Sequence, residues 1–63
     1  MTIEQAKQAL SEGKKVTHDY FASDEYIFQR ADGKIVSEDG VVHDNFFGLR
    51  QLPGWNDRWE IFN

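Results

Sequence analysis

The chain holds few side chains of the types that bind metals or act as thiol nucleophiles. Its only histidines are His18 and His43, and it contains no cysteine. The two histidines do not have the H-x-x-x-H spacing of a helical zinc site, and each lies in or beside a strand pattern. Without cysteine the chain forms no disulfide and no cysteine-ligated zinc site. We therefore expect no metal and no cofactor, with both histidines in structural or surface roles.

The remaining candidates for catalysis are three serines and two pairs of adjacent carboxylates. The serines are Ser11, Ser23 and Ser37. None of them lies at a strained strand-to-helix elbow, and no Ser-His-Asp arrangement follows from the spacing. The pairs Asp24-Glu25 and Glu38-Asp39 flank predicted turns, where exposed acidic side chains are expected. A chain of 63 residues also has little room for a pocket that excludes water. The sequence therefore predicts a protein that is not an enzyme.

Aromatic side chains and arginines, which dominate binding hot spots, concentrate in the C-terminal third. They are Phe46, Phe47, Arg50, Trp55, Arg58, Trp59 and Phe62. We interpret Trp59 and Phe62 as core residues. For Trp55 two interpretations stay open, an exposed binding anchor and a core residue, because it lies in a turn-rich segment where full burial is difficult. The predicted binding residues are Phe47, Arg50, Trp55 and Asp57.

The charge balance is acidic, with seven Lys and Arg against eleven Asp and Glu and a net charge of −4. We therefore expect no direct binding of nucleic acid, because that function requires a basic face. The excess of acid either keeps the chain in solution or imitates nucleic acid toward a basic partner. No apolar run approaches the ~20 residues that span a bilayer. The first five residues also lack the pattern of a signal peptide, so we expect a cytoplasmic location and no membrane contact.

One helix is expected at the start of the chain, over residues 3–12. Thr2 is a suitable N-cap and Gln5 completes a capping box, while Gly13 suits the position after the helix. Leu10 belongs to an apolar stripe with helical spacing. We expect this stripe to face the core.

Strand patterns follow, over residues 16–21, 25–30, 34–38, 41–43 and 59–62, with Asp-Gly turns at 32–33 and 39–40. Asp44 is expected to cap a short helical turn over residues 45–50, which Pro53-Gly54 would end. The sequence thus predicts a single domain over residues 1–63 in the α+β class. One N-terminal helix packs on an antiparallel sheet of about four strands, in two layers.

Several short motifs stand in a characteristic order along the chain. They are Ala6, Ala9-Leu10, Gly13-Lys14-Lys15-Val16, Phe21, Tyr26-Ile27-Phe28, Asp32-Gly33-Lys34-Ile35 and Trp59-Glu60-Ile61. This order resembles small phage-encoded proteins of a counter-defence family that includes Thoeris anti-defence proteins and some anti-CRISPR proteins. His18 stands where that family usually has arginine, and Phe21 where it has tryptophan. The resemblance implies a phage or prophage origin and a role against host machinery.

Three functions are consistent with these observations. The first is stoichiometric inhibition of a host defence or regulatory protein, through the predicted binding residues of the C-terminal third. An alternative is sequestration of a small nucleotide signal between protomers, for which Lys14, Lys15 and His18 are the candidate ligand-binding residues. A further alternative is an acidic mimic of nucleic acid.

Self-association is expected from the strand pattern and the size of the chain. Tyr26 and Phe28 share one strand parity and Ile27 has the other, so one helix cannot cover both apolar faces of the sheet. A core of this size is also marginal without a partner. We predict a two-fold dimer, which sedimentation at micromolar concentration would report as twice the chain mass. A monomer that is also very stable would contradict this prediction.

Overall fold

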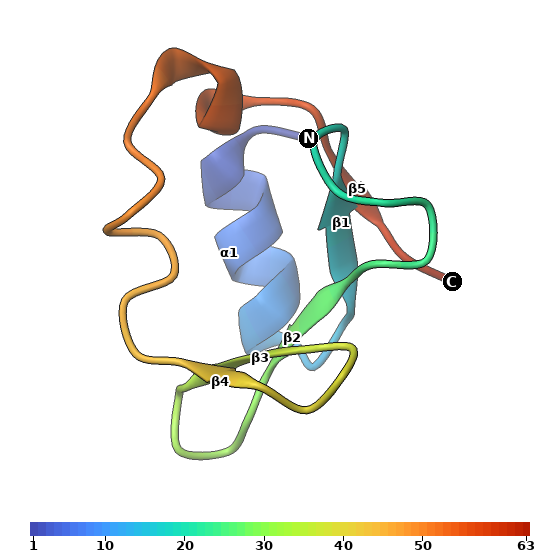
Figure 1. Cartoon of the computed structure of the whole chain (residues 1–63), viewed down its shortest axis with the longest axis vertical. Helices are drawn as coiled ribbons and strands as arrows, with labels where there is room; N and C mark the ends of the chain where they lie inside the picture. The colour runs from blue at the N-terminus through green and yellow to red at the C-terminus, as the bar shows by residue number, and fades with distance from the viewer.

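The computed structural model describes residues 1–63 as two helices and five short strands (Figure 1). The elements in chain order are α1 (Ile3–Ser11), β1 (Val16–His18), β2 (Ile27–Gln29), β3 (Ile35–Ser37), β4 (Val42–His43), the 3-10 helix η1 (Pro53–Asn56) and β5 (Trp59–Ile61). The strands form one sheet in the order β4-β3-β2-β1-β5, and every neighbouring pair is antiparallel. The predicted α+β architecture is confirmed, with five strands where about four were expected.

Helix α1 begins at the capping box that the sequence predicts. The Thr2 hydroxyl accepts a hydrogen bond from the Gln5 amide at 3.2 Å, and the Gln5 side chain accepts one from the Thr2 amide at 2.8 Å. The helix ends at Ser11, one residue earlier than expected. Gly13 follows in the left-handed region, with a φ of 85°, which turns the chain toward β1 at low steric cost.

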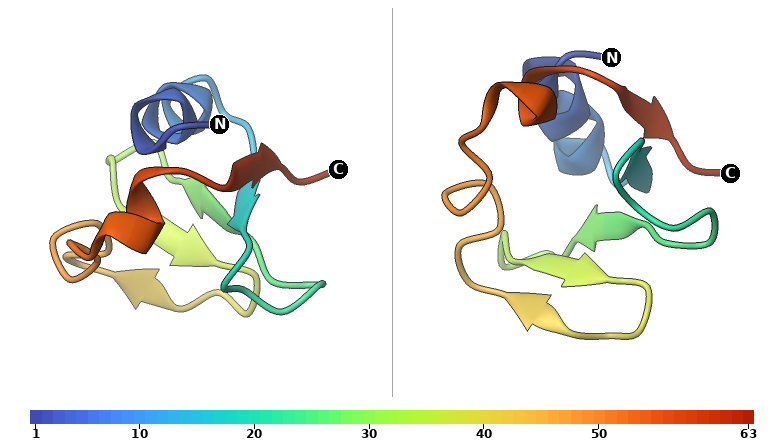
Figure 2. Two further views of the ribbon diagram at one scale, coloured as in Figure 1. Left: turned by 90° about the horizontal axis from the view of Figure 1, so that it is seen from above. Right: turned by 45° about the horizontal axis from the view of Figure 1, so that its top comes forward.

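The helix and the sheet form two layers (Figure 2). Ala6, Ala9 and Leu10 lie on the buried side of α1, which contacts β1, β2 and β5. The buried core is small. It consists of Ala6, Ala9, Leu10, Val16, Ile27, Ile35, Phe46 and Trp59. The predicted apolar stripe of the helix therefore supplies three of its eight members.

Strand β5 lies beside β1 and forms one edge of the sheet, and β4 forms the other edge. Their register pairs Thr17 with Glu60 and His18 with Trp59. Because side chains alternate across a strand, His18 and Trp59 point to the core, and both are buried. Strand β1 is shorter than predicted because the chain turns after His18, where the Phe21 amide donates a hydrogen bond to the His18 carbonyl at 2.9 Å.

The sheet face opposite the helix also carries apolar side chains. Phe28 pairs with Val36 across β2 and β3, and Val36 is buried on this face although no helix covers it. Tyr26 and Phe62 pack ring to ring at 4.7 Å, and the Lys15 ammonium lies 4.7 Å from the Tyr26 ring. These side chains shield one another in part, so the outer face is partly covered within a single chain.

The segment between β4 and η1 differs from the prediction. Residues 44–49 form successive turns and no regular helix. Asp44 does not cap a helix, and its carboxylate accepts a hydrogen bond from the Lys34 ammonium at 2.9 Å. Phe46 is buried and the adjacent Phe47 packs against the same core, a placement that suits turns because consecutive helical residues point in different directions. Pro53 begins η1 and does not end a helix, in keeping with proline's preference for a first helical position.

The packing of α1 yields a prediction for Leu10, whose exposed fraction is 2%. Leu10→Ala should lower the free energy of unfolding by about 2–5 kcal/mol, because it removes buried methyl groups and leaves a cavity. Urea denaturation followed by circular dichroism measures this loss. The control is Gln8→Ala on the exposed side of α1, which should change the stability by no more than about 0.5 kcal/mol. Equal effects of the two substitutions would contradict the packing of α1.

Candidate functional site

The predicted binding residues all lie in one segment, the C-terminal loop, which we define as residues 44–58. It connects β4 to β5, contains η1, and runs past α1 as the orange part of the chain in Figure 1. Phe47, Arg50, Trp55 and Asp57 belong to it. All four residues therefore lie in one continuous segment between two strands.

His18 anchors this loop from the end of β1. Its exposed fraction is 3%, and both of its ring nitrogens are hydrogen bonded. The Nε2 atom lies 3.0 Å from the Gly54 carbonyl oxygen and 2.8 Å from that of Asp57. The Nδ1 atom accepts a hydrogen bond from the Tyr20 amide at 3.0 Å. Because carbonyl oxygens only accept, Nε2 carries the proton and donates to the loop, which defines the neutral tautomer.

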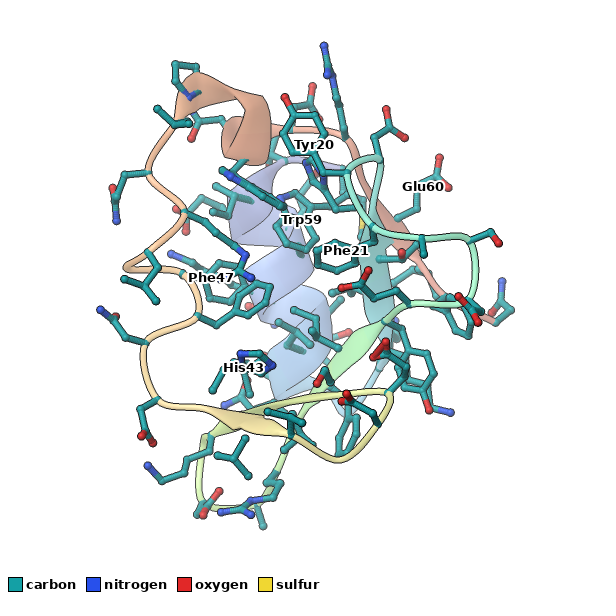
Figure 3. All side chains as sticks on the ribbon, in the orientation of Figure 1. Tyr20, Phe21, His43, Phe47, Trp59 and Glu60 are labelled. Carbon is teal, nitrogen blue, oxygen red and sulfur yellow. The ribbon has the colours of Figure 1, made fainter.

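Aromatic rings surround this histidine. The Trp55 ring lies 4.5 Å from the His18 ring and 6.0 Å from the Trp59 ring. The indole N–H of Trp59 donates a hydrogen bond to the Trp55 carbonyl at 2.8 Å. Figure 3 shows Tyr20, Phe21 and Trp59 gathered in this region. Trp59 is fully buried, as predicted, whereas Trp55 is half-buried and combines core packing with an accessible part.

Arg50 is turned back onto the loop. Its guanidinium lies 3.7 Å from the Phe46 ring centre, and its Nη1 donates a hydrogen bond to the Phe46 carbonyl at 3.0 Å. Its Nε is buried without a hydrogen-bond partner. Burial lowers the pKa of this guanidinium, and the Glu25 charge opposes the shift in part. Arg50 therefore supports the loop from within, and little of it is free to reach a partner.

Two leucines that the sequence analysis did not select are the most exposed large apolar residues of the chain. The exposed fraction is 76% for Leu49 and 73% for Leu52. Phe47 is half-buried under the Lys7 ammonium, while the Asp57 carboxylate is exposed and 3.9 Å from the N-terminal ammonium. The signal for the leucines was their position between Gly48 and Pro53, in a stretch without strand or helix periodicity.

The candidate ligand-binding residues of the nucleotide alternative do not come together. Lys14 and Lys15 are exposed before β1, whereas His18 is buried at the other end of that strand. Lys14 pairs with Glu12 at 3.2 Å, and Lys15 lies over Tyr26. Every cationic side chain is similarly engaged. Arg30 and Lys34 are in ion pairs, and Lys7, Arg50 and Arg58 lie near aromatic rings. A phosphate would therefore have to displace an existing contact.

A polar cluster at the β3–β4 turn brings a serine, a histidine and an aspartate together. The Ser37 hydroxyl donates a hydrogen bond to Asp39 at 2.6 Å and lies 3.2 Å from Nε2 of His43. The bond to Ser37 lowers the pKa of Asp39. In a catalytic triad the carboxylate binds the second histidine nitrogen, whereas here it binds the serine. The contacts thus fix a turn. No group of three or more potential ligand side chains is arranged to hold a metal ion.

Comparison with protein-family models, with curated proteins and with solved structures finds no match to this chain. No helix of the structure has the length and apolar character that crossing a membrane requires. The C-terminal loop is therefore the part of the molecule from which a function can be inferred.

The hydrogen bonds of His18 yield a prediction. His18→Leu fills the same core position with an apolar side chain, but it leaves the Tyr20 amide and two loop carbonyls without their hydrogen-bond partner. We expect it to lower the free energy of unfolding by about 3 kcal/mol, because unsatisfied buried groups cost about 1–3 kcal/mol each. Denaturation curves measure the loss. The matched control is His43→Leu, which removes one side-chain bond at the half-buried turn and should cost about 1 kcal/mol. Similar losses for both variants would contradict the anchoring role of His18.

Proposed function

We propose that this chain is a small binding protein that inhibits a host defence or regulatory protein by stoichiometric occlusion, with the C-terminal loop as its contact surface. The observation that carries the proposal is the exposure of Leu49 and Leu52 on one short loop. An exposed leucine by itself is ordinary, but two within four residues, next to a half-buried tryptophan, are typical of an interaction surface. The choice of a host protein as the partner depends on the resemblance to phage counter-defence proteins.

The support beneath the loop favours this function. The His18 bonds hold Gly54 and Asp57, and the Trp59 indole holds the Trp55 carbonyl. A surface whose backbone is fixed in advance loses little conformational entropy on binding, and this raises affinity for a given contact area. Occlusion requires no chemistry from the chain beyond this contact.

The proposal predicts that the exposed leucines matter for binding and not for folding. Leu49→Ala combined with Leu52→Ala should change the free energy of unfolding by no more than about 1 kcal/mol, because both side chains are already in water. The same double variant should weaken partner binding by tenfold or more, about 1.4 kcal/mol. Trp55→Ala is a poorer test, because that ring also packs against His18 and Trp59.

The measurement starts with capture of partners from bacterial lysate on wild type and on the double variant, followed by titration of the protein that only wild type retains. The matched control is Val41→Ala, which removes a half-exposed apolar side chain from the β3–β4 turn, outside the loop. It should leave capture and affinity unchanged. Equal retention of the captured protein by wild type and the leucine variant would refute the loop as the contact surface.

A further inference from the structure

The Tyr20 ring lies in a recess beside the C-terminal loop. We call this recess the seat, and it is formed by His18, Gly54, Trp55 and Arg58. Its ring lies 4.9 Å from the Trp55 ring, edge to face, and 4.8 Å from the His18 ring. The guanidinium of Arg58 lies 6.0 Å from the same ring. The walls of this seat are therefore two aromatic rings, with a cation at its rim. Such walls suit a flat aromatic group, since aromatic faces and edges attract each other and cations.

Gly54 forms the floor of the seat. A Cβ atom at this position would overlap the Tyr20 hydroxyl oxygen, so the ring lies directly against the backbone of η1. The φ of Gly54 is not in the left-handed region. Glycine is thus needed here for space and not for its backbone conformation. The Tyr20 ring can therefore pack against η1 only because residue 54 has no side chain.

The Tyr20 side chain is more exposed than the rings against which it packs. Tyr20 is 55% exposed, whereas His18 beneath it is buried and Trp55 is half-buried. Its hydroxyl makes no hydrogen bond within the chain, whereas its backbone amide donates one to Nδ1 of His18. The ring is held by its contacts with His18, Trp55 and Gly54, with the Arg58 guanidinium beside it, and it forms the outer layer over Trp55.

We propose that this seat is an aromatic-binding subsite of the contact surface, which the chain fills with its own Tyr20 and which a partner fills with a tyrosine or phenylalanine side chain in exchange. The inference depends on the proposed function, because it names the partner group that the surface accepts. The Tyr20 ring already contacts His18, Trp55 and Gly54, so an aromatic ring of the same size can make the same contacts. The exchange exposes Trp55 to the incoming ring.

The test uses p-cresol, the side chain of tyrosine as a free molecule, and requires no partner protein. Tyr20→Ala empties the seat, and millimolar p-cresol should then raise the melting temperature of this variant by several degrees. Wild type should bind p-cresol about tenfold more weakly, because its own Tyr20 competes. The matched control is Tyr20→Ala combined with Gly54→Ala, in which the new Cβ fills the floor and should abolish the response. Gly48→Ala in the same Tyr20→Ala background, where the atoms nearest to the new Cβ belong to the Asn45 side chain, should leave the response intact.

A second measurement keeps the test decisive if Tyr20→Ala does not fold. In spectra of ¹⁵N-labelled wild type, p-cresol should shift the Gly54 amide and the Trp55 indole signals saturably, and Gly54→Ala should remove these shifts. Equal p-cresol responses of Tyr20→Ala with and without Gly54→Ala would overturn the proposal. So would the absence of saturable shifts at these two signals. Because both measurements omit the partner, their failure is distinct from a failure of the leucine variants to weaken capture.

Discussion

The C-terminal half of this structure depends on the hydrogen bonds that the His18 imidazole makes to the backbone of the C-terminal loop. The ring joins the end of β1 to two backbone carbonyls of the C-terminal loop, that of Gly54 in η1 and that of Asp57 directly before Arg58. The geometry requires a donor on one side and an acceptor on the other, and the neutral histidine supplies both. The role is structural, and it explains why a buried polar side chain occupies a core with so few members.

The His18 hydrogen bonds hold the C-terminal end of the loop beside β1. Arg58, directly before β5, has a φ of 72°, an uncommon backbone conformation for a residue with a side chain. It persists where neighbouring contacts fix the chain on both sides, here the Asp57 carbonyl on His18 and the Trp59 indole on Trp55. Leu49 and Leu52 lie in the same loop, and their side chains are exposed to solvent.

The distribution of charge agrees with a protein that binds through apolar and aromatic contacts. The cations are used internally, either against carboxylates or over rings, and the most buried one, Arg50, supports Phe46. The carboxylates outnumber the cations and remain outside. An excess of exposed negative charge keeps apolar side chains in solution and disfavours association with other acidic surfaces.

The sequence by itself determined the helix, its capping box, the buried side of that helix and the antiparallel class of the sheet. These features depend on contacts between residues a few positions apart, so periodicity and turn chemistry specify them. The two Asp-Gly turns and the core role of Trp59 were predictable on the same grounds. Only the tertiary structure decided the course of residues 44–58, because Phe46 and Phe47 are drawn toward a core built by other segments. It also decided that His18 is buried with both ring nitrogens hydrogen bonded, and that Leu49 and Leu52 are exposed to water. The physical reason is that a side chain's role depends on what lies opposite it, and for this loop the opposing groups come from β1, β5 and α1, which a local pattern does not encode.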